Sequence, residues 1–345
     1  MTRAEEKKDW DRVSAWVAGQ GHVLDASGAV RFTGGLANLN HLVEFDGRPA
    51  VFRRPPAGVL AAGANDMARE WRVLSRLPQV YPLAPRGLLF APAGAVLEVP
   101  FQIIEYRPGI AVSDTLPDDA DRQAPARLTG SLIAAMTDLH RVDPDAAGLG
   151  DLGRPAGFLA RQLASWRRRA QAAWPAGVPA ALDRLAERLE RDGTEVDGGR
   201  VSLLHLDLKF DNMLVDPDTM TAQAVIDWDM ATRGDPLFDL AVLLAYWVEP
   251  GDPVGLHGLG RVPSLVPGFP TRAELAALYF ERSGTTPVRL DWHLALARLR
   301  LAVLWMQLFR LWQRGDLTGD HYDSFASLAH GLVEWADENY PKGTQ

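Results

Sequence analysis

Three polar side chains stand out in the stretch Leu203–Asp229, because the residues around them are mostly apolar. They are Asp207, Asn212 and Asp227. Short apolar runs that are broken by Asp-rich turns are typical of short strands joined by a tight turn. Such a hairpin would bring the two carboxylates and the amide together at one edge. Because Mg²⁺ prefers oxygen ligands and binds few carboxylates together with substrate phosphates, the stretch predicts a magnesium site.

The spacing of His205, Asp207 and Asn212 matches the pattern H-x-D-x-x-x-x-N of a kinase catalytic loop. In that loop the Asp accepts a hydroxyl proton and the Asn reaches a metal ion on the phosphates. Taken alone, the pattern is explained equally well by a surface loop with capping polar residues. Asp227 follows Asp207 by twenty residues, at the end of the run AVID. The two motifs in this order favour the catalytic interpretation.

Three more polar residues are assigned supporting roles. Asp229 would face the same side as Asp227 if the strand continued, and there it would support the metal site; it could equally cap a turn. Asp239 lies in the apolar run LFDLAVLLAYW, where a carboxylate is costly unless it is hydrogen-bonded. We expect it to bind backbone amides of the catalytic loop, although a helix N-terminal charge explains it nearly as well. His205 is expected to be a structural hydrogen-bonding residue rather than a base.

The N-terminal part carries strand signals. Residues 30–53 contain three apolar stretches, a glycine-rich first turn and an Asp-Gly second turn, which predict three antiparallel strands. Gly34 and Gly35 in the first turn would let backbone amides approach phosphates, although most Gly-Gly turns are only hairpins. Arg53 in the third strand could meet the α- and β-phosphates, and Glu70 on the following helix could orient it. The alternative for Arg53 is a solvated charge at the edge of a strand.

The rest of the chain is mainly helical in its pattern. A strand is expected over 95–106, and 249–270 is expected to be irregular because it is rich in Gly and Pro. A break at Pro108-Gly109 precedes the helical part, so we place a boundary between two lobes near residue 107. Helices are expected over 5–18, 65–77, 122–140, 158–173, 179–191, 238–248, 272–282, 292–314 and about 321–339.

Composition limits the function classes. The chain has 345 residues and a net charge of −8, which argues against a nucleic-acid-binding protein with a broad basic surface. It contains no cysteine, which removes disulfides, thiolate nucleophiles and zinc–sulfur sites and fits a cytoplasmic protein. No apolar run reaches the roughly 18 residues that span a bilayer, and the N-terminus lacks the apolar core of a signal peptide. We therefore expect no membrane partner and no nucleic acid.

Several blocks along nearly the whole chain resemble the aminoglycoside phosphotransferase family, the small-molecule branch of the protein-kinase-like fold. These blocks are FTGGLANLNHLVEF, AVFRRPP, MAREWRVLSRL, FQIIEYRPG, LLHLDLKFDN and VIDWDMATRGDPLFDLA. Others are similar to a narrower subset that is fused to acyl-CoA dehydrogenase domains in eukaryotes. Those are GLGDLGRPAGFLARQLASW, LAYWVEPGD and PGFPTRAELAALYFERSG.

The resemblance implies an α+β, two-lobed fold with an antiparallel-sheet N-lobe over 1–107 and a mainly helical C-lobe over 108–345. It implies ATP and Mg²⁺ as cofactors and Asp207 as the catalytic base. The remaining site residues that it implies are the metal ligands Asn212 and Asp227, the nucleotide-loop residues Gly34, Gly35 and Asn38, and the adenine-binding hinge Glu105, Tyr106 and Arg107. Family members usually carry Lys where this chain has Arg53, which keeps the charge but changes its geometry.

The leading hypothesis is therefore an ATP- and Mg²⁺-dependent phosphotransferase that acts on a hydroxyl group of a small molecule. Arg53 supports an alternative, a non-catalytic nucleotide-binding module. An aminoglycoside resistance kinase is a further alternative, but the sequence has no dense acidic run for a cationic substrate. The basic helix with Arg161, Arg168 and Arg169 could neutralise an anionic carrier such as CoA, which would fit a hydroxyacyl-CoA substrate. An exposed basic helix face explains these arginines more simply.

Overall fold

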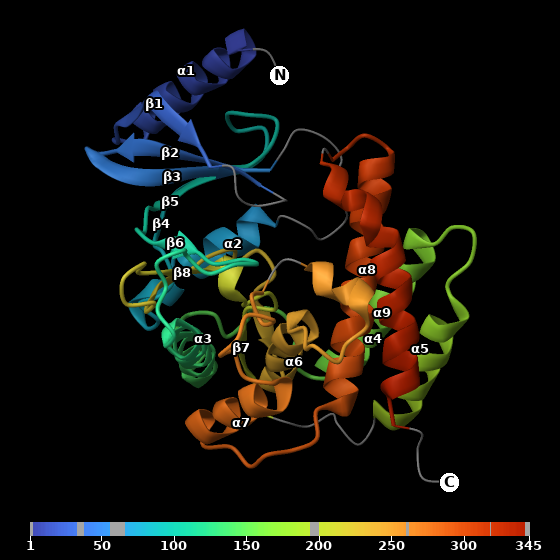
Figure 1. Cartoon of the computed structure of the whole chain (residues 1–345). Helices are drawn as coiled ribbons and strands as arrows, with labels where there is room; N and C mark the ends of the chain where they lie inside the picture. Colours follow the sequence, from blue (N-terminus) through green and yellow to red (C-terminus); the bar gives the residue numbers. More distant parts are fainter. Residues whose placement is uncertain are drawn as a thin grey trace.

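The computed structural model describes residues 3–32, 38–55, 66–193, 200–259, 262–317 and 319–341. An antiparallel sheet occupies the N-terminal part and helices make up most of the C-terminal part (Figure 1). This arrangement confirms the predicted α+β class with an N-terminal antiparallel sheet and a helical C-terminal region.

The N-terminal sheet has five antiparallel strands in the order β1-β2-β3-β5-β4. They are β1 (Leu24–Arg31), β2 (Leu39–Phe45), β3 (Arg48–Arg54), β4 (Gly87–Ala91) and β5 (Phe101–Glu105). The three predicted strands are thus present, joined between β2 and β3 by the expected Asp-Gly turn. In the centre of the sheet, Arg53 on β3 pairs in register with Asn40 on β2 and with Gln102 on β5.

The predicted strand over 95–106 is too long. The strand β5 begins only at Phe101, because the preceding residues form a turn in which Gly94 N donates to Leu97 O (2.8 Å). Pro100 stands immediately before the strand. The glycine has φ of +81°, so only a residue without a Cβ takes this position without strain.

Two helices accompany the sheet. The helix α1 (Arg3–Gly19) lies along it in Figure 1 and places Val13 and Val17 in one core with Phe52 and Phe101 of the sheet. The helix α2 (Met67–Leu74) is shorter than the predicted 65–77. It begins at the N-cap Asp66, whose side chain accepts from Arg69 N (3.0 Å).

Two small sheets follow the N-terminal region. The strands β8 (Met213–Val215) and β9 (Ala222–Val225) form the predicted hairpin, and β6 (Ile110–Ala111) adds to its edge. The strands β7 (Ser202–Leu204) and β10 (Thr232–Gly234) form the other sheet. Between β7 and β8 lies the catalytic loop, residues 205–212, which ends in the short helix η3 (Phe210–Asn212).

The helical region agrees with the predicted pattern to within a few residues at most ends. Its helices are α3 (Ala124–Arg141), α4 (Phe158–Ala173), α5 (Ala180–Asp192), α6 (Pro236–Tyr246), α7 (Arg272–Ser283), α8 (Asp291–Gln313) and α9 (Phe325–Asn339). Shorter 3-10 turns are η1 (Leu77–Gln79), η4 (Val254–Leu259) and η5 (Asp320–Ser324). The region predicted as irregular, 249–270, contains η4, and its residues 260–261 lie outside the described residues.

The helical region has two hydrophobic cores. One lies among α4, α5, α8 and α9, and the other joins α3, α6 and α7 to the β8–β9 hairpin. The catalytic loop contributes Leu206 to the first core and Leu208 and Phe210 to the second, so its backbone is anchored in both. In the described parts of the chain, no helix is both long and apolar enough to cross a bilayer.

Candidate functional site

One buried carboxylate accepts hydrogen bonds from the backbone at the start of the catalytic loop. Asp239, in the first turn of α6, accepts from His205 N (2.9 Å) and from Leu206 N (2.6 Å). These are the backbone bonds that the sequence predicts for it. Leu206 has φ of +63°, a conformation that β-branched and bulky residues rarely adopt, so the two bonds fix a strained turn. Asp207 follows directly after this turn.

The two oxygens of Asp207 have different surroundings. Oδ2 accepts from Lys209 Nζ (2.7 Å) and from Asn212 Nδ2 (2.8 Å). Oδ1 is buried and has no hydrogen-bond partner among the described residues. A carboxylate oxygen that is out of water and unbonded is costly, so it is poised to accept a proton donor that a ligand brings.

Lys209 is a site residue that the sequence reasoning missed. Its side chain is 7% exposed, and its ammonium group bonds Asp207 and lies 3.1 Å from Asp211 Oδ1. Burial alone would lower the pKa of Lys209, but Asp207 and Asp211 raise it, so the amine stays charged. The available signal was the run DLKFD, in which a single Lys stands between two acids in an apolar frame.

Asp227 reaches the catalytic loop through the hairpin. The strand β9 ends at Val225, Ile226 N donates to Asn212 O (2.9 Å), and Asp227 turns with φ of +69°. Asp227 therefore stands beside the end of the catalytic loop, as predicted. The strand does not continue to Asp229, so the condition under which Asp229 would face the same side as Asp227 on a strand is not met.

His205 joins the two segments. Its Nε2 lies 2.9 Å from Ile226 O, and its Nδ1 accepts from Asp207 N (3.2 Å). Because Nδ1 accepts, Nε2 must carry the ring proton. Burial lowers the pKa of His205. The ring is thus a neutral hydrogen-bonding spacer, which is the structural role expected of it.

Arg53 connects the N-terminal sheet to this site. Its Nε donates to Glu70 Oε2 (2.8 Å), one terminal nitrogen donates to Asn40 Oδ1 (3.3 Å), and the other bonds Asp227 Oδ1. Glu70 also accepts from Gln102 Nε2 (2.6 Å). The guanidinium is therefore a buried, oriented group and not a solvated strand-edge charge.

The site gathers more carboxylates than cations. Burial, followed by the nearby carboxylates of Asp227 and Glu70, raises the pKa of Asp229 to about 8. Burial would also raise the pKa of Asp227, but Arg53 lowers it. Crowding of this kind is relieved by a bound cation, since an opposite charge favours the ionised form of each acid.

The donor set fits Mg²⁺. Both hydrogen bonds of the Asn212 side chain use Nδ2, so its Oδ1 remains available as a metal ligand together with Asp227. The described residues contain no group of three or more His, Cys, Asp or Glu side chains placed to hold a metal by themselves. Mg²⁺ in phosphoryl-transfer sites takes one or two carboxylates and completes its shell with phosphates and water.

The predicted nucleotide-binding residues are only partly described. Glu105 ends β5, and its side chain accepts from Arg86 N (3.0 Å), so this carboxylate is occupied by its neighbouring segment. Arg107 bonds Pro82 O. Tyr106 is half-buried between these two. Asn38 is half-buried, and its buried Nδ2 and Oδ1 bond no described residue. The glycines at 34 and 35 lie outside the described residues.

The arginines of α4 do not form one patch. Arg161 bonds the carbonyls of Arg154 and Ala156. Arg168 lines a cavity of about 360 Å³ between α4 and α5. Arg169 stacks on the ring of Trp166 at 4.6 Å.

Arg169 lies near Arg300, an arginine that contacts the catalytic loop. Arg300 is 1% exposed and donates to Leu206 O (2.8 Å). The guanidinium of Arg300 lies 5.6 Å from the Trp166 ring, on which Arg169 also stacks. The pKa of Arg169 is lowered mainly by burial and, to a smaller extent, by the positive charge of Arg300. Arg300 is a further residue that sequence reasoning missed, because an arginine inside an apolar helix carries no motif.

Comparisons with known proteins agree with this geometry. A model of the "Phosphotransferase enzyme family" matches residues 28–278. Among curated proteins, the chain is 26% identical over 310 residues to acyl-CoA dehydrogenase family member 10 of Mus musculus, covering 89% of this chain and 28% of that protein. It is 27% identical over 308 residues to family member 11 of Rattus norvegicus, covering 88% and 39%. The chain thus spans well under half the length of these relatives.

Solved structures share the fold. A protein proposed to be an aminoglycoside phosphotransferase, from Ralstonia eutropha, superposes with a TM-score of 0.78 at 22% identity, covering 97% of this chain and 99% of that one. Aminoglycoside phosphotransferase APH(4)-Ia in complex with AMP-PNP and hygromycin B gives 0.59 at 17% identity, covering 92% and 95%. Macrolide 2'-phosphotransferase MphH from Brachybacterium faecium gives 0.56 at 19%, covering 98% and 100%.

Proposed function

The chain belongs to the phosphotransferase enzyme family, and we propose that it transfers the γ-phosphoryl group of ATP to a hydroxyl group of a small molecule, with Mg²⁺ as cofactor. The observation that carries the proposal is the unbonded Oδ1 of Asp207. Lys209 and Asn212 hold the other oxygen, so the carboxylate is oriented and Oδ1 is left to accept the proton of the acceptor hydroxyl. Positioned bases of this kind contribute about 10²–10⁴ in rate.

Asn212 Oδ1 and Asp227 would hold the magnesium ion. The chemistry that the ion would supply there is neutralisation of the negative charge on the transferred phosphoryl group. The chain's own contribution is orientation: His205 and the Ile226–Asn212 backbone bond keep the two ligand residues on adjoining segments. Asp229 would support this site in its ionised form, which a bound cation favours over the protonated form that its raised pKa otherwise favours.

Arg53 would contact the nucleotide phosphates. Its ion pair with Glu70 fixes the guanidinium, and its bond to Asp227 occupies the position that phosphate and metal would share. We propose that residues 1–107 form the nucleotide-binding lobe, with the backbone at Glu105–Arg107 and the glycine turn at 34–35 as nucleotide contacts. Residues 108–345 then form the lobe that carries the base and the acceptor.

We propose a hydroxyacyl-CoA as the acceptor. Two observations support an anionic acceptor of this class. The curated relatives are named as acyl-CoA dehydrogenase family members, and Arg169 lies beside Arg300, which contacts the catalytic loop at Leu206 O. Arg161 and Arg168 are turned to other contacts, so Arg169 is the arginine of α4 that carries this part of the proposal.

The test is a coupled ATP-consumption screen over hydroxyacyl-CoAs, simple alcohols and aminoglycosides. Asp207→Asn is the key variant, because the amide keeps the shape and a contact to Lys209 but cannot take a proton. We expect its kcat to fall about 10³-fold or more, while calorimetry shows Mg·AMP-PNP binding of comparable affinity. Asp218→Asn, an exposed acid in the β8–β9 turn, is the matched control and should keep its full rate.

An unchanged rate in Asp207→Asn would show that Asp207 is not the base. Binding of Mg·AMP-PNP without ATP consumption against every acceptor would instead indicate a non-catalytic nucleotide-binding module. Consumption with aminoglycosides alone would replace the hydroxyacyl-CoA proposal and leave the assigned reaction in place.

A further inference from the structure

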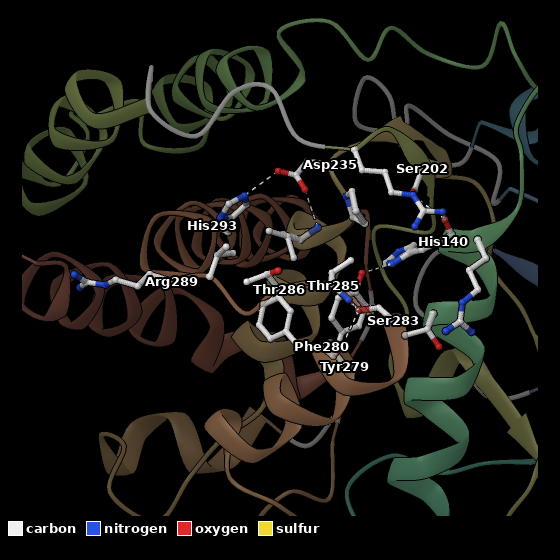
Figure 2. Close-up of a pocket in the computed structure, with 16 residues that line it drawn as sticks. His140, Ser202, Asp235, Tyr279, Phe280, Ser283, Thr285, Thr286, Arg289 and His293 are labelled. Carbon is white, nitrogen blue, oxygen red and sulfur yellow. Dashed lines mark hydrogen bonds and ion pairs between the residues drawn. The ribbon is translucent and has the colours of Figure 1, made fainter.

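A second cavity lies behind the catalytic loop, among α3, β7, α6, α7 and the start of α8. Its volume is about 350 Å³, within the ~300–1,000 Å³ usual for small-molecule sites. Figure 2 shows Tyr279, Phe280, Thr285 and Thr286 converging on it, with His140 beside them. Aromatic and aliphatic groups form most of its wall, so an occupant must have an apolar body.

The charges at this cavity favour an anion. Three arginines line it, namely Arg141, Arg200 and Arg289, and the carboxylate of Asp235 is already bonded to His293 (3.0 Å). Arg141 is paired with Asp138 (2.9 Å), whereas Arg200 donates to a backbone carbonyl, His140 O (3.1 Å). Arg289 donates to Asp291 only through Nε (2.8 Å), so its terminal nitrogens have no partner among the described residues. An occupant with a negatively charged head would meet Arg200 or the terminal nitrogens of Arg289.

One buried nitrogen at the wall also lacks a partner. His293 is 3% exposed, and its Nε2 faces the carboxylate of Asp235, which can only accept, so Nε2 carries a proton. Its Nδ1 is buried and bonds no described residue. Buried polar atoms without partners are rare in folded proteins and are often completed by a ligand. Because Nε2 carries the ring proton, Nδ1 of the neutral ring is an acceptor, so the group that completes it must be a donor, such as a water that enters with the ligand.

The cavity wall is bonded to the catalytic loop. Tyr279 Oη lies 2.9 Å from His140 Nδ1, and His140 Nε2 lies 3.1 Å from Asp239 Oδ2. That oxygen accepts from His205 N, and the other oxygen accepts from Leu206 N. Figure 2 shows the His140–Tyr279 bond at the cavity. Three side chains therefore separate an occupant from the backbone that positions Asp207.

We propose that this cavity binds a small amphiphilic carboxylate, with an aliphatic or aromatic body against Leu237, Tyr279 and Phe280. Its charged head meets either Arg200, which bonds His140 O, or Arg289 at the opposite end of the cavity (Figure 2). We further infer that binding is transmitted to the catalytic loop through Tyr279, His140 and Asp239. The binding part of this proposal is independent of the proposed phosphotransfer.

Binding is tested by calorimetry of the purified chain with octanoate, with octan-1-ol and acetate as probes of body and head alone. Octanoate should bind, and one of the two variants Arg200→Gln and Arg289→Gln, the one at the end that holds the head, should weaken it about fivefold, since charge-assisted bonds at a solvent-exposed mouth are partly screened. Arg314→Gln is the matched control for Arg289→Gln. Arg289 and Arg314 are both exposed, and the Nε of each donates to an aspartate two residues further on. Arg314 does not line the cavity, so Arg314→Gln should bind octanoate with unchanged affinity.

A blocking variant gives a second, independent check. Leu237→Trp should fill the cavity and abolish octanoate binding while thermal unfolding shows an intact fold. The site is wrong if octanoate does not bind the unmodified chain, or if Leu237→Trp binds it normally. Equal affinity for octan-1-ol would overturn the carboxylate assignment, as would a result in which both arginine variants bind like Arg314→Gln.

Transmission is tested by hydrogen–deuterium exchange, which does not depend on catalysis. A ligand that binds the closed form suppresses local opening, so octanoate should slow exchange in peptides covering 202–210 as well as in α7. Tyr279→Phe keeps the ring but removes the hydroxyl that meets His140. In this variant, octanoate should still slow exchange in α7, while the slowing at 202–210 is lost. Unchanged slowing at 202–210 in Tyr279→Phe would refute the transmission path.

Discussion

The catalytic loop has two sides that are built in opposite ways. On the side that faces Arg53, charged side chains from distant segments meet, and Asp207 Oδ1 is left unbonded among the described residues. On the side that faces Asp239, a single buried carboxylate receives two backbone amides and one imidazole nitrogen. The first side leaves bonding capacity for ligands, whereas the second is bonded fully within the chain.

This difference separates chemistry from stability. Under the proposed function, groups on the Arg53 side would exchange partners when nucleotide and acceptor bind, so we expect their contacts to contribute less to the stability of the fold. Groups on the Asp239 side fix a backbone turn with positive φ at Leu206, and they cannot change without moving Asp207. Substitutions on the two sides should therefore affect different measurements.

The largest effect on stability is expected from Asp239→Asn. The asparagine side chain offers one acceptor oxygen where the carboxylate offers two. The backbone N–H of His205 or Leu206, or the buried His140 nitrogen, therefore loses its partner. A buried hydrogen-bonding group that is left without its partner costs about 1–3 kcal/mol, and more where the lost partner was charged, as Asp239 is. Denaturant unfolding should show this loss of free energy of unfolding.

Asp235→Asn is the matched control for this prediction. Asp235 is also paired with a histidine, but it caps the N-terminus of α6, where Asn serves about as well as Asp. His293 can keep its bond to the new amide by moving its proton from Nε2 to the unbonded Nδ1, so that Nε2 accepts. The free energy of unfolding lost in Asp235→Asn should be ~1 kcal/mol or less. Equal losses in both variants would mean that the Asp239 side has no special share in stability.

The next effect concerns the Arg53 side, through Arg53→Lys. A lysine replaces three directed bonds to Glu70, Asn40 and Asp227 with one point charge, so geometry is lost while charge remains. We expect kcat/KM for ATP to fall about tenfold or less, with phosphotransfer retained. Steady-state kinetics would check this, with Arg54→Lys as the neighbouring control. A loss as large as that in Asp207→Asn would give Arg53 a role beyond contacting phosphate.

The two sides also differ in how far the sequence predicts them. Arg53, Glu70, Asn212 and Asp227 were found because short motifs carry them and because the β8–β9 hairpin follows from its turn. The bonds of Asp239 followed from a physical need, since a carboxylate in an apolar run must find donors.

The partners on the Asp239 side could not be found in this way. His140, Tyr279 and Arg300 come from three helices far apart in the sequence and carry no recognisable spacing. Their meeting depends on how α3, α7 and α8 pack. The end of β9 at Val225 was also missed, because the hydrophobic run continues to Ile226 and gives no sign of the turn at Asp227.

The smallest effect should appear at His205, which touches both sides of the loop. Its pKa is lowered by burial, so at mildly acidic pH the unfolded chain binds a proton that the folded chain does not. The stability that this histidine contributes is therefore fully present above the unfolded pKa of about 6.5 and is lost as the pH falls below it. His205→Gln can still donate to Ile226 O but cannot titrate.

The measurement is the difference in free energy of unfolding between the unmodified chain and His205→Gln. This difference should be constant between pH 7.5 and 8.5, which serves as the internal control. Between pH 6.5 and 5.5 the unmodified chain should lose stability relative to His205→Gln, by no more than about 1.4 kcal/mol per pH unit. A difference that grows on acidification would mean that the buried imidazole is protonated in the folded chain. In that case His205 would add a positive charge between Asp207 and Asp239, and the two sides of the loop would be electrostatically joined rather than separated by a neutral ring.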